Sequence, residues 1–149
     1  MADLPTPLRG YYLLNTDGGM AFNGRRRAGD PLGEAAIGVL LRTPRLVPLD
    51  QVSKAIGPAS QNVAEYKALI EGLRLARRHG IERIRVYMDS ELVVEQMNGR
   101  ADVKEPRLRE LHEAASGLAD EYRSIRIAWV PREMNAEADG LVRAALGAI

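Results

Sequence analysis

The chain contains no cysteine. This absence excludes disulfide bonds, thiolate nucleophiles and zinc sites built from cysteine. Histidine is scarce as well, since only His79 and His112 are present, so a histidine-rich metal site or a serine–histidine–aspartate relay has little to draw on. Chemistry in this protein therefore has to rest on carboxylates, hydroxyls, amides and arginine.

Long apolar runs are also missing. No stretch approaches the roughly 18 apolar residues of a membrane-spanning helix, and the opening MADLPTPLRG lacks the hydrophobic segment of a signal peptide. We therefore expect a cytoplasmic protein without a membrane partner. The 149 residues lie within the range of about 100–200 residues for one domain. We expect a single domain over residues 1–149, with residues 1–10 loosely ordered.

Lysine and large aromatic residues are few. Lys54, Lys67 and Lys104 are the only lysines, so most cationic residues are arginine. Arginine suits bidentate phosphate contacts, although a compositional bias toward arginine explains the same pattern. The single tryptophan, Trp129, is accompanied by only one phenylalanine and five tyrosines, which leaves few rings for stacking on unpaired bases. This favours duplex recognition through backbone shape, and we expect Trp129 to be a core residue.

The hydrophobic pattern predicts an α/β protein. Apolar runs and alternation predict five strands, near residues 11–16, 35–42, 46–56, 84–88 and 125–129. Helical spacing predicts four helices, near residues 62–79, 90–97, 106–122 and 135–146. Ser90 and Asn135 are expected helix caps, Gly80 ends the first helix, and Pro48 suggests an edge strand. Strands separated by helices favour parallel pairing, whereas the first three can form an antiparallel meander. Together these predict a mixed sheet with helices on its faces.

The first predicted helix has a charged residue on its apolar face. In QNVAEYKALIEGLRLA, residues 61–76, the buried stripe contains Leu69, Leu73 and Ala76, and Glu65 falls on the same stripe. A carboxylate that faces a core is costly unless it is paired or binds a metal ion. Extension of the side chain toward the helix N-terminus, or an arginine partner, would also explain it.

Three further acids lie at the ends of predicted elements. Asp17 and Asp89 follow strands, where ligands of open α/β sheets gather. Asp139 lies early in the last helix, on a stripe with apolar residues. Each acid also has a simpler explanation: Asp17 as a turn former before glycine, Asp89 as a helix cap, and Asp139 as a partner of Arg143.

Convergence of these acids would remove the simpler explanations. Four carboxylates without a cationic partner repel one another and raise their pKa values unless divalent cations lie among them. Oxygen ligands suit Mg²⁺ or Mn²⁺ rather than zinc. Two such ions about 3.5–4 Å apart can clamp a phosphodiester for in-line attack. A metal site would thus explain why Glu65 faces inward.

Four segments carry a family resemblance. NTDGG, SQNVAEYKALIEGL, VYMDSELVVEQM and WVPREMNAEADGLVRAAL together resemble ribonuclease H of type 1, over roughly residues 11–146. The resemblance implies a five-stranded mixed sheet in the order 3-2-1-4-5 with helices on both faces, and we expect a monomer without a protein partner. It also implies Mg²⁺-dependent endonucleolytic cleavage of the RNA strand in RNA/DNA hybrids, leaving 3′-hydroxyl and 5′-phosphate ends.

The resemblance further implies roles for individual residues. Two metal ions would be held by the family's four acidic positions, Asp17, Glu65, Asp89 and Asp139. The ions would activate the attacking water and stabilise the leaving 3′-oxygen. Substrate contacts would come from Gly18, Asn23, Ser60, Gln61, Asn62, Lys104 and Arg132. Ser60 and Asn62 would hold a phosphate of the DNA strand, and Gln61 with Asn23 would reach the minor groove. A polar turn and a helix cap would explain the same residues without a substrate.

This sequence departs from the family pattern in three places. The loop after Asp17 contains Arg25, Arg26 and Arg27, which either contact phosphates or form a solvated loop. Some family members hold the hybrid with an additional helix rich in basic residues. No such helix lies between Gly99 and Pro106, so we expect modest, salt-sensitive affinity for the hybrid. The loop PREMN, residues 131–135, lacks the histidine that many members carry. Arg132 or Glu133 are candidates to replace it, whereas we expect His79 and His112 to be structural or exposed to solvent.

Two other functions are compatible with these acids or with this fold. A 3′–5′ exonuclease also uses four carboxylates and two metal ions, but it usually needs a tyrosine or histidine near the last acid, which NAEADGL lacks. A non-catalytic nucleic-acid-binding module would have no reason to keep four acids.

Overall fold

The computed structural model describes residues 10–21 and 32–147. Its elements, in chain order, are β1 (Tyr12–Ala21), β2 (Gly33–Arg42), β3 (Pro48–Ala59), α2 (Gln61–Arg78), β4 (Arg83–Met88), α3 (Glu91–Met97), α4 (Pro106–Ala119), β5 (Ser124–Trp129), the 3₁₀ helix η1 (Arg132–Asn135) and α5 (Ala136–Gly147). The predicted order of strands and helices is confirmed.

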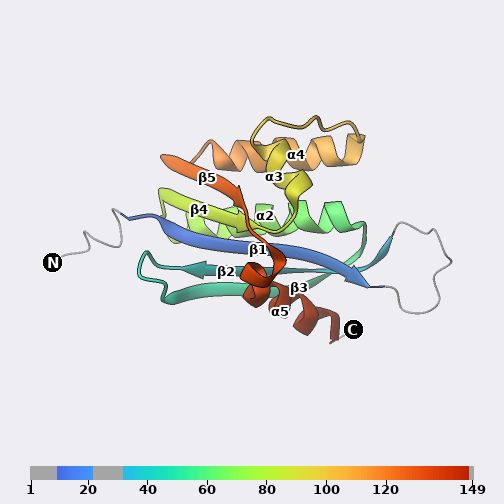
Figure 1. Cartoon of the computed structure of the whole chain (residues 1–149), viewed down its shortest axis with the longest axis horizontal. Helices are drawn as coiled ribbons and strands as arrows, with labels where there is room; N and C mark the ends of the chain where they lie inside the picture. The colour runs from blue at the N-terminus through green and yellow to red at the C-terminus, as the bar shows by residue number, and fades with distance from the viewer. Residues whose placement is uncertain (1–9, 22–31, 148–149) are drawn as a thin grey trace.

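The five strands form a mixed sheet in the order β3-β2-β1-β4-β5 (Figure 1). β1 pairs with β2 and β2 with β3 in antiparallel fashion. β1 also pairs with β4, and β4 with β5, in parallel fashion. The sheet order implied by the family resemblance is therefore confirmed, and β3 lies at an edge, as Pro48 predicts.

Helices cover both faces of the sheet. Alternate residues of β1 point to opposite faces, and a Cβ atom at Gly72 of α2 would lie 3.0 Å from the side chains of Leu14 and Thr16. The main core forms between this face, α2 and α4, with Tyr66, Leu69 and Leu73 among its fully buried side chains. A smaller cluster on the other face joins Ala36 of β2 to Val142 and Ala145 of α5. Figure 1 shows α5 in front of the sheet and α2 behind it.

Some predicted helix ends are confirmed by cap contacts. Ser60 and Ser90 each accept a hydrogen bond from the backbone N–H three residues later, and they begin α2 and α3. Gly80, just after α2, has a positive φ of 77°, which a glycine adopts at little cost.

Several predictions about the elements are wrong. β1 does not end after Thr16 at a turn of Asp17 and the glycines that follow, because Gly18 and Gly19 continue the pairing with β2. α4 ends at Ala119 instead of reaching Tyr122, whose buried hydroxyl donates a hydrogen bond to the Leu73 carbonyl at 2.6 Å. Trp129 is 47% exposed rather than in the core. Its position at the end of β5 leaves the ring uncovered, and its indole N–H donates to the Asp89 carbonyl.

Two glycines allow the helices to approach the sheet closely. A Cβ atom at Gly18 would lie 2.2 Å from the carbonyl carbon of Ala64 in α2. A Cβ atom at Gly38 would lie 2.2 Å from the carbonyl oxygen of Ala138 in α5. Because both obstacles are backbone atoms, any larger residue would push a helix away from the sheet.

No helix within residues 10–21 and 32–147 is long and apolar enough to cross a membrane. The expectation of a loosely ordered start falls on residues 1–9, outside the described part of the chain, apart from Gly10.

We predict that Gly38→Ala lowers the free energy of unfolding by about 2 kcal/mol, within the range of 1–3 kcal/mol that overpacking typically costs. The control is Gly117→Ala in α4, where a Cβ would meet nothing within 4 Å and should add about 0.5–1 kcal/mol of stability. Urea denaturation of both variants measures the difference. Equal stability of the two variants would contradict the close packing of α5.

Candidate metal centre

Sheet register places Asp17 beside Asp89. β1 and β4 are parallel, with Tyr12 opposite Ile84 and Asn15 opposite Tyr87. The same offset carries Asp17 to the level of Asp89, two residues beyond the last pair. Both carboxylates therefore lie at the carboxyl end of β4, as predicted for ligands of an open α/β sheet.

Glu65 reaches the same point from α2. Its side chain is buried, and the backbone N–H of Gly18 donates to its Oε1 at 2.9 Å. Gln61, one turn earlier, donates to the Gly18 carbonyl at 2.6 Å and to Glu65 Oε2 at 3.3 Å. Carboxylate oxygens of Asp17, Glu65 and Asp89 lie within 4.8 Å of one another. The inward position of Glu65 is thus confirmed, and its carboxylate lies beside those of Asp17 and Asp89.

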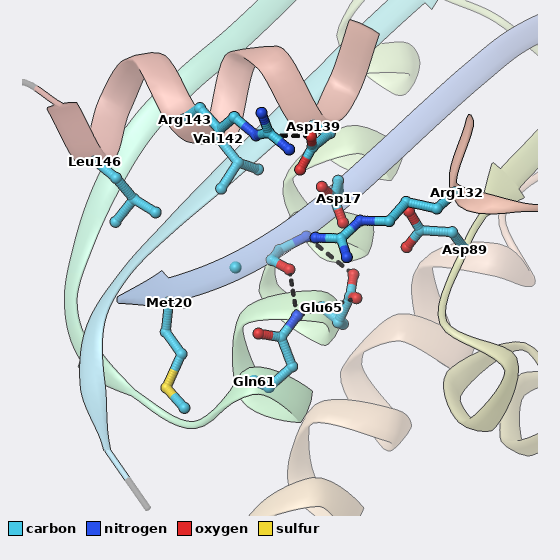
Figure 2. Close-up of a pocket in the computed structure, with 12 residues that line it drawn as sticks. Asp17, Met20, Gln61, Glu65, Asp89, Arg132, Asp139, Val142, Arg143 and Leu146 are labelled. Carbon is cyan, nitrogen blue, oxygen red and sulfur yellow. Dashed lines mark hydrogen bonds and ion pairs between the residues drawn. The ribbon is translucent and has the colours of Figure 1, made fainter. Parts of the chain in front are cut away.

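Asp139 joins the group from α5. It lines the same cleft of about 470 Å³ as the other three acids, and Figure 2 shows four carboxylates from different segments directed into it. Arg143, one turn later, pairs with Asp139 at 2.9 Å, so the simpler explanation for Asp139 also holds. Asp139 is in hydrogen-bond contact with Asp17 as well.

Two of the crowded acids, Asp17 and Glu65, hold protons at neutral pH in the absence of a metal ion. Burial, followed by the charges of Glu65, Asp89 and Asp139, raises the pKa of Asp17 to about 9. Burial also raises the pKa of Glu65 to about 8, against the opposing hydrogen bond from Gly18. The pKa of Asp89 is raised by burial too, while a hydrogen bond from Asn135 and the charge of Arg132 oppose the rise.

This donor set fits a divalent cation. It consists of carboxylate oxygens only, which Mg²⁺ and Mn²⁺ prefer. Asp17, Glu65 and Asp89 are close enough to share an ion, and their raised pKa values show that the folded protein holds them together at an electrostatic cost. A dication would remove that cost.

Only some of the predicted substrate residues line the cleft. Gly18, Gln61 and Arg132 line the cleft. Ser60 caps α2, and Asn62 is half-buried in the first turn of the same helix. Lys104 is exposed and does not line the cleft. Asn23 and the three arginines Arg25, Arg26 and Arg27 lie outside the described residues.

Arg132 is one of the two candidates to replace the histidine that the PREMN loop lacks, and it lines the cleft. Figure 2 shows its guanidinium extended between Asp17, Glu65 and Asp89, and its charge lowers the pKa values of Glu65 and Asp89. His79 and His112 lie elsewhere, in hydrogen bonds with Asp50 and with the Gln96 carbonyl. Their predicted structural role agrees with these contacts.

Sequence reasoning missed the polar residues behind the carboxylates. Asn15 is buried in β1, and its side chain donates to Asn135 at 3.0 Å. Asn135 was expected to cap α5, but its side chain binds Asn15 and the Thr16 carbonyl. An amide inside the apolar run YYLLNT was the available signal, because a buried polar group needs a partner.

Comparison with known proteins identifies relatives. A family model described as reverse transcriptase-like matches residues 21–145. The "Bifunctional protein Rv2228c" of Mycobacterium tuberculosis is 48% identical over 100 residues, which cover 67% of this chain and 28% of that protein. The chain therefore spans little more than a quarter of that relative's length. "Ribonuclease HI" of Halobacterium salinarum is 37% identical over 125 residues, covering 84% of this chain and 62% of that protein.

Solved structures agree with the sequence comparison. The crystal structure of RNase H1 from Halobacterium salinarum has a TM-score of 0.84 at 32% identity, covering 94% of this chain and all of that chain. LC11-RNase H1, solved in complex with an RNA/DNA hybrid, has a TM-score of 0.80 at 36% identity. That match covers 91% of this chain and 96% of that chain.

We predict that the metal-free protein loses stability as the pH rises. The folded-state pKa values of Asp17 and Glu65, about 9 and 8, exceed the ordinary values of 3.8 and 4.5. The resulting stabilisation is therefore complete below about pH 4 and is lost by about pH 9. Asp17→Asn removes most of this dependence.

Thermal unfolding in chelator at pH 5 and pH 9 tests the prediction. At pH 9 Asp17→Asn should melt at least about 3 °C above the wild type, the shift that ~1 kcal/mol gives in a domain of this size. At pH 5 the two should agree more closely. Asp120→Asn, an exposed aspartate after α4, is the control and should follow the wild type. A constant difference at both pH values would mean that Asp17 is ionised in the metal-free protein.

Proposed function

The chain belongs to the type 1 ribonuclease H family, and from this premise we propose that it is a metal-dependent endonuclease that hydrolyses the RNA strand of RNA/DNA hybrids. The cluster of Asp17, Glu65 and Asp89 in an open cleft is the observation that carries the proposal. The similarity to LC11-RNase H1, a protein solved with such a hybrid, supports the choice of substrate. The products would carry 3′-hydroxyl and 5′-phosphate ends.

The resident ions are proposed to be Mg²⁺, with Mn²⁺ as a substitute, held in a pair by Asp17, Glu65, Asp89 and Asp139. When bound, they supply Lewis acidity for activating the attacking water and neutralise charge at the leaving 3′-oxygen. Asp17 is the best candidate for a ligand shared by both ions, because its carboxyl contacts both Asp89 and Asp139. Gly18 and Gln61 hold Glu65 in a single orientation toward this position.

The surroundings of the cleft suit a duplex. Gln61, Ser60 and Asn62 lie at the N-terminus of α2, where backbone N–H groups favour a phosphate. A wide, shallow minor groove displays the 2′-hydroxyl groups that distinguish RNA from DNA. Arg132, directed into the cleft, would contact the phosphate backbone near the scissile bond. We propose that a single chain acts without a protein partner.

The proposed activity predicts that Asp89→Asn lowers the cleavage rate by about 100-fold or more, since the substitution removes a charged ligand from the centre. The measurement follows a 5′-labelled RNA strand annealed to DNA, with Mg²⁺ and with chelator. Asp120→Asn is the control and should cut at the wild-type rate.

Three outcomes are informative. Internal cuts that occur only in the hybrid and require the metal ion support the proposal. Stepwise shortening from the 3′ end would instead indicate an exonuclease. Binding of the hybrid without any cutting by the wild type would indicate a nucleic-acid-binding module.

A second prediction concerns Arg132. In the Asp89→Asn background, Arg132→Ala should weaken hybrid binding several-fold and reduce the slope of log affinity against log salt by about 1, the share of one phosphate contact. Fluorescence anisotropy with a labelled hybrid measures both quantities. Arg123→Ala is the control, because Arg123 is exposed at the opposite end of β5 from the cleft. An unchanged salt slope would show that Arg132 does not contact a phosphate.

A further inference from the structure

A row of side-chain hydrogen bonds crosses the sheet beneath the carboxylates. Arg42 Nη2, at the end of β2, donates to Asn15 Oδ1 at 2.9 Å. Asn15 Nδ2 donates to Asn135 Oδ1 at 3.0 Å. Asn135 Nδ2 donates to the Thr16 carbonyl at 3.0 Å, and the Asn135 side chain also hydrogen-bonds the Asp89 carboxylate. The row therefore runs from a guanidinium to an acid of the candidate metal centre.

The row has a direction because its first member can only donate. A guanidinium has no acceptor, whereas an asparagine amide has one side that accepts and one that donates. Arg42 thus requires Asn15 to present its oxygen to β2 and its NH₂ group to Asn135. Asn135 must in turn present its oxygen to Asn15 and its NH₂ group to Thr16 and Asp89.

Burial makes this direction costly to reverse. Asn15 is 5% exposed and Asn135 is 1% exposed, so water cannot replace a lost partner. If the Asn135 amide were turned over, its oxygen would face the Thr16 carbonyl and the Asp89 carboxylate. Hydrogen-bond acceptors would then face each other with no donor hydrogen between them, which costs more free energy than the loss of a single hydrogen bond.

We infer that Arg42 and Asn15 are positioning residues for the metal centre, which set the orientation of the Asn135 amide so that it holds Asp89 in place for a divalent cation. This inference rests on the proposed function. Arg42 also connects β2 with α5, because its Nη1 lies 3.7 Å from Oε1 of Glu137, two residues before Asp139.

The first test uses the polarity at position 42. Arg42→Lys keeps a group that only donates, whereas Arg42→Met keeps a similar aliphatic length without a donor. We expect Arg42→Met to weaken Mn²⁺ binding about 3–10-fold, less than the 10–100-fold typical of losing a direct hydrogen-bond partner of a metal ligand. Arg42→Lys should stay within about 2-fold of the wild type by the same reasoning. Mn²⁺ binding is measured by electron paramagnetic resonance without substrate.

The second test uses position 15. Asn15→Asp keeps the volume and the pairing with Arg42, but its carboxylate can only accept and so requires the Asn135 amide to turn over. Asn15→Ala removes the contact and leaves Asn135 free to keep its bonds to Thr16 and Asp89. We therefore expect Asn15→Asp to bind Mn²⁺ more weakly than Asn15→Ala. Urea denaturation of each variant separates this order from the order of stability.

The outcomes separate the inference from the proposed function. Wild-type affinity for Mn²⁺ in Arg42→Met, or losses that follow stability alone with Asn15→Ala the weaker binder, would overturn the inference and leave the function intact. Equal losses in Arg42→Lys and Arg42→Met would also overturn it. Absence of Mn²⁺ binding to the wild type would overturn both the inference and the proposed function. Since Arg42 is only half-buried, its two variants decide the question even where the Asn15 variants fail to fold.

Discussion

The contacts of Gly18 with α2 and of Gly38 with α5 determine how near the two helices lie to the sheet. Backbone atoms of Ala64 and Ala138 occupy the space of a side chain at these two positions. Glu65 and Asp139, each the next residue along its helix, therefore reach Asp17 from opposite faces of the sheet. The sheet itself contributes the remaining acid, because the parallel register of β1 and β4 brings Asp89 to the level of Asp17. The close approach of α2 and α5 to the sheet is thus what allows the four carboxylates to meet.

Bringing four acids together has an electrostatic cost that the surrounding residues reduce in different ways. Protons remain on Asp17 and Glu65 because burial disfavours their ionised forms. Gly18, Gln61 and Asn135 donate hydrogen bonds that keep the carboxylates oriented. Arg132, which extends among the acids, and Arg143, which pairs with Asp139, add positive charge to the cleft. The carboxylates are therefore already grouped before a cation enters, and binding requires release of the protons on Asp17 and Glu65.

Much of this arrangement could be predicted from the sequence. The strand and helix periods, the cap at Ser90, the helix end at Gly80 and the inward-facing Glu65 were sufficient to predict the elements and to suspect an acidic centre. The extension of β1 through Gly18 and Gly19 could not be predicted, because two glycines usually indicate a turn and only pairing with β2 overrides that preference. The exposure of Trp129 and the bonds of Asn135 likewise depend on tertiary neighbours that local patterns do not contain.

Proton release on metal binding tests most directly whether the carboxylates form a cation site that holds protons when empty. Titration calorimetry of Mg²⁺ into the metal-free protein at pH 7, repeated in buffers of different ionisation enthalpy, measures the number of protons released per site. Because the pKa values of Asp17 and Glu65 are about 9 and 8, binding should release between one and two protons. Binding without proton release would contradict this account, because the acids would then be ionised before the ion arrives.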